Sequence, residues 1–386
     1  MAMIPPTPPK SVLGRHRILA PTASVRVSPL CLGGMSFGTN WAMGLGECTK
    51  EMTYDLLDTF YDLGGNFVDT ANAYQGGQSE EWIGDWMAER GRRNEMVIAT
   101  KYTMTPMAGK PVNQSNYGGT GSKTMHISIE ASLKALKTDY IDIYYVHAWD
   151  YATSISELMQ SLNTLVLQGK VLYLGISDAP AWFVTKANAY ARHHGLRTFS
   201  VYQGRYSAQQ RDMEREIIPM AREEGMAIQA FGVLGGGGFK APGAEGTGAR
   251  RMPPAMLIGR EQQVSKVLHN VAQRHNVPLT SVALAYAMQK TPYFYPIIGG
   301  RKTEHLKANI EALTLRLTPE DVAEIETGYE FDVGFPHNFI NMARHMIEGP
   351  QHVTIMHDLG YFDYVAPPAA IKPHQGEITA PWQAPQ

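Results

Sequence analysis

Short apolar runs alternate along the chain with stretches in which apolar residues recur every three or four positions. Short runs are typical of buried strands, and the three-and-four spacing is typical of amphipathic helices. The pattern predicts eight strands, mostly about 25 to 35 residues apart, with helices between them. The predicted strands are residues 30–33, 66–69, 96–100, 141–147, 171–177, 199–203, 226–231 and 295–299.

Three of the predicted helices have clear starting points. The best defined follows Ser154, which together with Glu157 has the spacing of a capping box. The other two are expected after Thr49 and after Ser79. Their apolar positions are Ile155, Leu158, Met159, Leu162, Leu165 and Val166 in the first, Met52, Leu56, Leu57 and Phe60 in the second, and Trp82, Ile83, Trp86 and Met87 in the third.

Alternating strands and helices predict a parallel sheet, and eight strands close naturally into a barrel. The competing architecture is a doubly wound sheet, which usually carries G-x-G-x-x-G after its first strand. The glycines here are Gly33, Gly34 and Gly38, which miss that spacing. We therefore predict an α/β fold of the (β/α)8 TIM-barrel class. Residues 16–19 and 24–27 are expected to form a hairpin at the bottom of the barrel.

The domain organisation expected from these patterns is simple. A loose lead of residues 1–14 precedes one barrel domain of residues 15–330, and a C-terminal extension of residues 331–386 follows. Aromatic residues in the extension indicate that part of it folds near the barrel mouth, whereas residues 367–386 look loose.

Two segments interrupt the regular spacing of the barrel. Residues 104–123 and 235–254 are rich in glycine and follow the third and seventh strands. Both would therefore lie at the carboxyl-end face, where barrel enzymes hold their active sites. We interpret them as candidate lids.

Composition narrows the classes of function. The 34 Lys and Arg residues against 36 Asp and Glu give a formal charge of −2, so no general attraction to nucleic acid or to an anionic membrane is expected. Cys31 and Cys48 are too few for a disulfide framework and lack metal-site spacing. No stretch approaches the roughly 18 apolar residues of a membrane span, and the Pro-rich start lacks a signal-peptide core. These features favour a cytoplasmic protein that binds a small molecule and no metal.

Four polar residues mark the candidate chemistry. Asp69 and His147 each end a predicted strand, Lys101 directly follows one, and Tyr74 lies in the turn after the strand that Asp69 ends. A tyrosine hydroxyl, with an ordinary pKa near 10, exchanges protons near neutrality only if its surroundings stabilise the phenolate. A lysine ammonium can do this, and an aspartate can keep that lysine charged. Any one of the four is more often a loop anchor or a solvated charge, but together on one face they fit protonation of a carbonyl oxygen.

The second half of the chain adds features of a nucleotide site. Ser177 with Asp178, Gln203 and Phe231 end consecutive predicted strands; their polar groups suit a carboxamide and the phenyl ring suits a planar ring. After the eighth strand, two glycines and the cations of Arg301 and Lys302 lead into a helix. Backbone amides at a helix start with adjacent cations are typical of phosphate binding.

These motifs together resemble those of the aldo-keto reductases. The segment FVDTANAY at residues 67–74 is similar to the family signature D-T-A-x-x-Y, and Lys101 and His147 match the remaining members of its tetrad. The resemblance extends over residues 27–328. Residues 77–80, 116–119 and 202–205 look most like the fungal aryl-alcohol dehydrogenase and norsolorinic acid reductase branch. The resemblance implies NADPH-dependent reduction of aromatic aldehydes or polyketide-type ketones, often in secondary metabolism.

The resemblance also implies roles for individual residues. Tyr74 would be the general acid, Lys101 and Asp69 its tuning pair, and His147 the group that orients the substrate, with Trp41 shaping the pocket. Arg301 would meet the 2′-phosphate of NADP(H). The full set of implied cofactor contacts is Gly34, Met35, Asp69, Ser177, Asp178, Gln203, Phe231, Gly232, Leu234, Gly236, Gly299, Arg301, His305 and Asn309.

Two departures from the family pattern affect only cofactor contacts. Asp178 replaces the usual Asn and can accept but not donate, and Ala308 replaces a common Glu. An alternative function is a nucleotide-binding regulatory subunit that resembles the potassium-channel β-subunits, which retain the tetrad. A non-redox isomerase using Lys101 and His147 is a more distant alternative, because it leaves the carboxamide-binding groups without a purpose.

Overall fold

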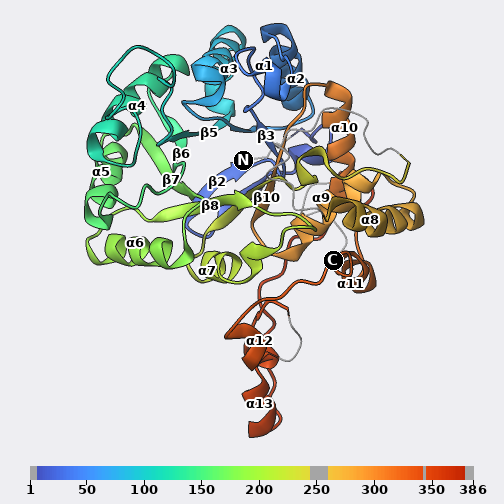
Figure 1. Cartoon of the computed structure of the whole chain (residues 1–386). Helices are drawn as coiled ribbons and strands as arrows, with labels where there is room; N and C mark the ends of the chain where they lie inside the picture. The colour runs from blue at the N-terminus through green and yellow to red at the C-terminus, as the bar shows by residue number, and fades with distance from the viewer. Residues whose placement is uncertain (1–6, 244–259, 342–344, 379–386) are drawn as a thin grey trace, which may run out of the picture.

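Eight parallel strands close into a barrel in the structure, which is a computed structural model and describes residues 7–243, 260–341 and 345–378 (Figure 1). The last strand pairs with both the first and the seventh, so the ring is complete. The predicted (β/α)8 barrel is thereby confirmed. The strands are β3 (Cys31–Gly33), β4 (Phe67–Asp69), β5 (Val97–Tyr102), β6 (Ile141–Val146), β7 (Val171–Ser177), β8 (Phe199–Arg205), β9 (Ala227–Phe231) and β10 (Phe294–Ile298).

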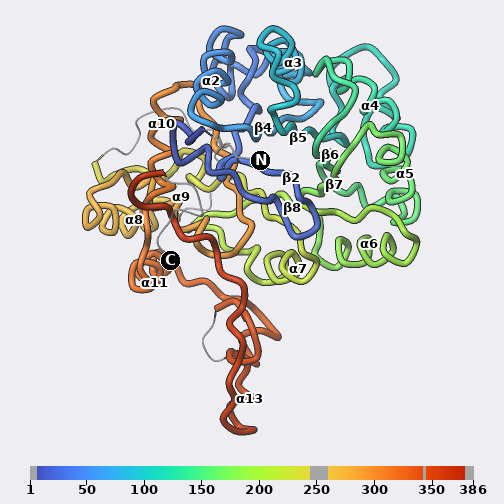
Figure 2. The backbone as a smooth tube through the Cα atoms, turned by 180° about the vertical axis from the view of Figure 1, so that it is seen from behind, coloured from blue at the N-terminus to red at the C-terminus, as the bar shows by residue number. Residues whose placement is uncertain are grey.

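Helices surround the barrel as an outer ring (Figures 1 and 2). Side chains alternate along each strand, so one set fills the barrel and the other packs under the helices. Tyr145, for example, lies in the inner cluster and Tyr144 in the outer one. The helices are α1 (Ala42–Leu45), α2 (Lys50–Asp62), α3 (Gln78–Arg90), α4 (Ser122–Ala135), α5 (Ile155–Leu167), α6 (Ala181–His193), α7 (Ile217–Glu223), α8 (Glu261–His275), α9 (Leu279–Lys290), α10 (Thr303–Glu311) and α11 (Pro319–Glu326).

The helix starts predicted after Ser154 and Thr49 are confirmed, but the capping box at Ser154 and the start after Ser79 need correction. Ser154 caps α5 by accepting the N–H of Glu157, but the Glu157 carboxylate accepts from the backbone N–H and hydroxyl of Ser122 at the start of α4. Only the serine half of the capping box is therefore used. Helix α3 begins at Gln78, and the hydroxyl of Ser79 donates to the carbonyl of Gly34 at 2.8 Å. Ser79 serves tertiary packing and does not cap the helix.

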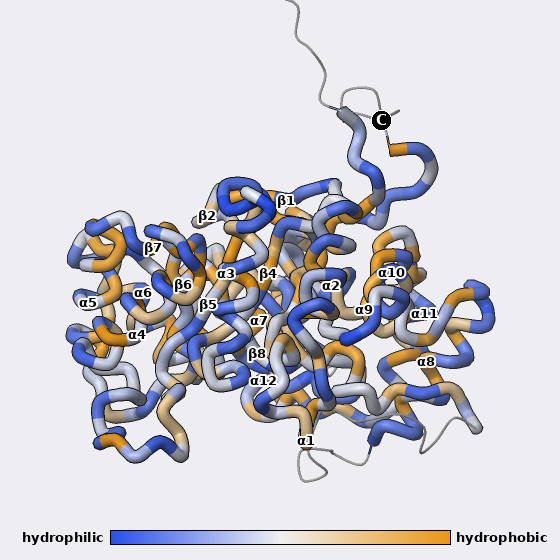
Figure 3. The backbone as a smooth tube through the Cα atoms, turned by 90° about the horizontal axis from the view of Figure 1, so that it is seen from above, coloured by the Kyte–Doolittle hydropathy of each residue, from blue (hydrophilic) through white to orange (hydrophobic). Residues whose placement is uncertain are grey.

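The predicted hairpin is present as β1 (Arg17–Ala20) and β2 (Ala23–Val27), which pair antiparallel. Leu19 and Val27 are buried in the same cluster as the inward side chains of the barrel. The Tyr295 hydroxyl on β10 donates to the Ile18 carbonyl at 2.7 Å. The hairpin therefore covers one end of the barrel, and α1 lies at the opposite, carboxyl end (Figure 3).

The C-terminal extension lies differently from expectation. It packs on the barrel through Phe331 and Val333, but helices α12 (His337–Ile340) and α13 (Thr354–Leu359) project away from the barrel (Figures 1 and 2). Phe339 is 79% exposed there. Met346, which follows α12, is again buried in the outer cluster of the barrel, so the described part of the extension packs beside the barrel and not over the mouth.

Other expectations concern the ends and a loop. Residues 367–378 form no helix or strand, although the Pro373 carbonyl accepts from Arg316. Residues 379–386 and 244–254 lie outside the described residues, so the second candidate lid is described only from 235 to 243. Within the described residues, no helix is both long and apolar enough to span a membrane.

Candidate active site

The four residues singled out from the sequence converge at the carboxyl ends of three neighbouring strands. Asp69 ends β4, Lys101 lies one residue before the end of β5, and His147 directly follows β6. Tyr74 opens the short 3-10 helix η2 (Tyr74–Gly77) after β4. The order β4-β5-β6 in the barrel places these elements side by side.

Lys101 is the centre of the cluster. Its side chain is fully buried, and its Nζ donates to Asp69 Oδ2 at 2.7 Å, to the Thr70 carbonyl at 2.8 Å and to the Tyr74 hydroxyl at 3.3 Å. All three ammonium protons thus have acceptors, as a buried charge requires. Thr70 was not identified from the sequence, because a backbone carbonyl leaves no signal there.

The electrostatics of the cluster follow from burial and from these contacts. Burial alone disfavours the Lys101 ammonium, but Asp69 and Tyr74 outweigh it and raise the pKa of Lys101 above its ordinary value. Burial raises the pKa of Tyr74, and Lys101 opposes this rise without cancelling it. The sequence prediction of Lys101 as a stabiliser of the phenolate is correct in direction, but the phenol remains the dominant form.

His147 faces Tyr74 across the mouth. Their ring centres are 5.7 Å apart with planes at 78°, and the His147 backbone N–H donates to the Tyr102 carbonyl at 3.1 Å. Burial, and then the Lys101 charge, lower the pKa of His147 to about 3. The imidazole is therefore neutral at ordinary pH. Its Nδ1 is buried and finds no hydrogen-bond partner in the described part of the chain.

Trp41 forms the neighbouring wall, with its ring centre 6.4 Å from that of Tyr74 and the planes at 71°. The loop that carries it is held by Gln75, whose Oε1 accepts from the Trp41 N–H at 2.7 Å and whose Nε2 donates to the Met35 carbonyl at 3.1 Å. Trp41 and Met35 are 39% and 38% exposed. Gln75 was missed from the sequence, because nothing in the local pattern shows which loop its amide holds.

The polar groups of the second half join the same end of the barrel. Ser177 ends β7, and its buried hydroxyl has no hydrogen-bond partner among the described residues. Gln203 on β8 donates from Nε2 to Asp69 Oδ1 at 2.8 Å, which links it directly to the lysine cluster. Asp178 has a φ of 46°, a left-handed conformation that Asn and Asp adopt more readily than most residues. The substitution of Asn by Asp therefore preserves the local backbone.

The segment after β9 is rich in glycine. Phe231 ends β9 with its side chain partly exposed, and Gly232 and Gly236 have φ values of 75° and 61°. Side chains are disfavoured in that region, so the backbone here can approach a ligand closely. Leu234 lies between these glycines and is partly buried.

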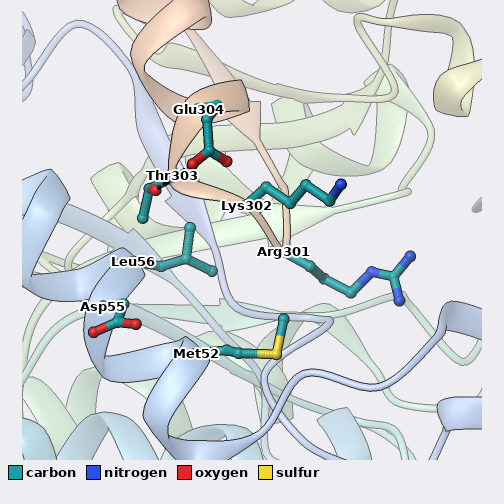
Figure 4. A pocket seen from close by; sticks show the side chains of 7 residues that line it. All are labelled: Met52, Asp55, Leu56, Arg301, Lys302, Thr303 and Glu304. Atoms are coloured by element: carbon teal, nitrogen blue, oxygen red, sulfur yellow. Dashed lines mark hydrogen bonds between the residues drawn. The ribbon is translucent and has the colours of Figure 1, made fainter.

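A pocket lies between α2 and α10 (Figure 4). Arg301 and Lys302 extend from the β10–α10 turn in the same direction, away from Asp55 on α2. The Arg301 guanidinium packs over Gly46, where a Cβ would come within 1.8 Å of it. The pocket is lined by Met52, Asp55, Leu56, Arg301, Lys302, Thr303 and Glu304.

The remaining predicted cofactor residues surround these two regions. Gly299 directly follows β10, while His305 is exposed and Asn309 buried on α10. Gly34 follows β3, and its N–H donates to the Asp69 carbonyl at 2.7 Å. A side chain at Gly34 would meet the Ser79 hydroxyl at 2.9 Å. The predicted residues are thus distributed from the tetrad to the α10 pocket.

Taken together, a closed parallel barrel and a Tyr–Lys–Asp–His cluster at its carboxyl end define a barrel oxidoreductase. The chain belongs to the aldo/keto reductase family, whose model matches residues 29–330. It is 71% identical to an aryl-alcohol dehydrogenase of Pestalotiopsis microspora over 99% of both chains. It is 51% identical to norsolorinic acid reductase B of Dothistroma septosporum over 93% of this chain and 94% of that one. An aldo-keto reductase of Emericella nidulans is 49% identical over 86% of each chain. The family generally uses NAD(P)H.

Proposed function

We propose that the protein is an NADPH-dependent reductase that converts an aromatic aldehyde or a polyketide-type ketone to its alcohol, reversibly. The observation that carries the proposal is the buried contact of Lys101 with both Asp69 and the Tyr74 hydroxyl. The relatives named for aryl alcohols and for norsolorinic acid support the substrate class. By the same similarity, we propose that the reaction belongs to secondary metabolism.

The residues of the cluster suit the proton half of a carbonyl reduction. A bound nicotinamide supplies the hydride for such a reaction. Because its pKa is raised, Tyr74 is protonated at neutral pH and can donate to the developing alkoxide. Lys101, kept charged by Asp69, then stabilises the phenolate that remains.

His147 is suited to aim the substrate. As a neutral ring it has one N–H to offer a carbonyl oxygen, and it does not compete with Tyr74 as a charged acid. Together with Trp41 and Tyr74 it presents an aromatic lining. Such a lining favours a planar aromatic substrate over a small aliphatic one.

The residues present fit a nicotinamide nucleotide. The buried Ser177 hydroxyl, with no partner among the described residues, and the Gln203 amide are suited to the carboxamide, and Phe231 to the ring. The glycine segment from Gly232 to Gly236 suits the pyrophosphate. We assign the preference for NADPH to Arg301, whose charge in the α10 pocket fits a 2′-phosphate. The adenine end would lie by His305 and Asn309.

The test is NADPH oxidation by the purified protein, followed by absorbance with a panel of aromatic aldehydes and aliphatic aldehydes of similar size. We expect turnover with NADPH that is faster for the aromatic compounds. Nucleotide binding without turnover of any carbonyl would support the regulatory-subunit alternative instead. Cys31 and Cys48 are both buried and neither is part of a disulfide, which suits a reducing compartment, so we place the protein in the cytosol.

A further inference from the structure

A polar layer lies inside the barrel, directly below the lysine cluster. Its centre is Gln229 in β9, which is fully buried. Its Oε1 accepts from Gln203 Nε2 at 2.8 Å and from the Tyr145 hydroxyl at 2.6 Å, and its Nε2 lies 3.0 Å from Cys31 Sγ. A buried amide is costly unless it is paired, and every one of these partners is itself buried. The hydrogen bonds of Gln229 therefore offset the cost of burying its amide inside the barrel.

The fold makes specific room for this layer. A Cβ at Gly175 in β7 would lie 2.4 Å from the Tyr145 ring, so only glycine lets the ring lie across that strand. The hydroxyl of Tyr145 then reaches Gln229, which is 84 residues away in the sequence. Because residue 175 is a glycine, the Tyr145 ring can lie where its hydroxyl holds the Gln229 amide in position.

The layer restricts what Gln203 can offer to a ligand. Its Nε2 has two protons, and one is donated to Asp69 Oδ1 while the other is donated to Gln229 Oε1, both at 2.8 Å. A primary amide has no further donor, so only the carbonyl oxygen of Gln203 remains for a ligand at the mouth. That oxygen can accept a proton from the amide nitrogen of a carboxamide.

We propose that Gln229 and Tyr145 are positioning residues that orient the Gln203 amide as an acceptor and thereby set the binding of the nicotinamide carboxamide. This inference rests on the proposed function, because it assumes a nicotinamide nucleotide at the mouth. Both residues are fully buried below the mouth, so they act through Gln203. Without the Gln229 oxygen, one Gln203 proton has no acceptor, and the amide is free to rotate away from its binding orientation.

The test compares the binding of two ligands by titration of intrinsic tryptophan fluorescence. NADPH carries the nicotinamide, whereas adenosine 2′,5′-bisphosphate carries only the adenine end with its phosphates. For Gln229→Met we expect the Kd of NADPH to rise about 3- to 10-fold, the range of one lost hydrogen bond, with no change for the bisphosphate. Tyr145→Phe, which keeps the ring and loses only the hydroxyl, should shift the NADPH Kd in the same direction by a smaller factor.

The matched control is Tyr144→Phe. This tyrosine precedes Tyr145 but stacks on Tyr102 in the outer cluster, and its buried hydroxyl has no hydrogen-bond partner among the described residues. Its loss should leave both Kd values unchanged. Equal NADPH affinity in the wild type and in both Gln229→Met and Tyr145→Phe would overturn the inference. Parallel weakening of both ligands would also overturn it, since that indicates a general structural effect. Failure of the wild type to bind NADPH would instead remove the proposed function, and the inference with it.

Discussion

Lys101 Nζ and Asp69 Oδ2 lie 2.7 Å apart and are both buried, although 32 residues separate them in the sequence. Their strands β5 and β4 are neighbours in the barrel, and the register between them brings the two side chains together. A buried ion pair contributes little net stability, but the loss of one partner leaves an uncompensated charge. The pair therefore matters most through what it does for Tyr74.

Asp69→Asn should destabilise the protein by about 3 to 5 kcal/mol and abolish most turnover, because the Lys101 ammonium loses its counterion in a buried site. Urea unfolding and NADPH oxidation measure the two effects. Asp62→Asn is the matched control, since Asp62 pairs with Lys10 at 3.9 Å on the surface with both side chains mostly exposed. Its effect on stability should stay within about 0.5 kcal/mol. Equal effects of the two substitutions would contradict the buried-pair interpretation.

Tyr74→Phe should abolish carbonyl reduction while NADPH still binds. The ring stays in contact with Trp41 and His147, and only the hydroxyl that meets Lys101 is lost. Steady-state turnover and fluorescence titration of NADPH separate the two properties. Undiminished turnover would remove Tyr74 from the role of proton donor.

Arg301→Ala should weaken NADPH binding by roughly 10- to 100-fold and NADH binding much less, because a charge-assisted contact with a phosphate contributes roughly 1.5 to 3 kcal/mol. Lys307→Ala removes an exposed cation from the same helix, α10, outside the residues that line the pocket. That control should change neither affinity by a comparable factor. An equal loss of affinity for NADPH and NADH in Arg301→Ala would show that Arg301 does not bind the 2′-phosphate.

His147 should make the protein less stable as the pH falls below about 6.5, the ordinary histidine value. The pKa of His147 is lowered to about 3 in the folded state, so between these values only the unfolded chain takes up the proton. Unfolding is then favoured by acid, with a slope of up to about 1.4 kcal/mol per pH unit. Urea unfolding at pH 7 and pH 5 should show a larger loss for the wild type than for His147→Gln. An identical pH dependence would indicate that His147 titrates normally in the folded protein.

Much of this protein was predictable from local pattern. The eight strands, the hairpin and the four residues of the cluster are all visible in the sequence. A buried strand needs a short apolar run, and Asp69, Lys101 and His147 each lie at or next to the end of one. Once the strands are parallel, their carboxyl ends share one face. The barrel and the position of the four-residue cluster at its carboxyl end therefore follow from sequence alone.

Only the tertiary structure decided the partners of these groups. Glu157 pairs with Ser122 and not with its own helix, and Gln203 meets Asp69 from 134 residues away. The direction of the pKa shift of Tyr74 also depends on the folded structure. Burial raises this pKa by more than the Lys101 charge lowers it. A hydrogen-bond donor selects among acceptors that the folded chain brings within about 3 Å, and those acceptors come from strands far apart in sequence. Local pattern determines which residues reach the mouth; their geometry there determines what each of them can still offer to a ligand.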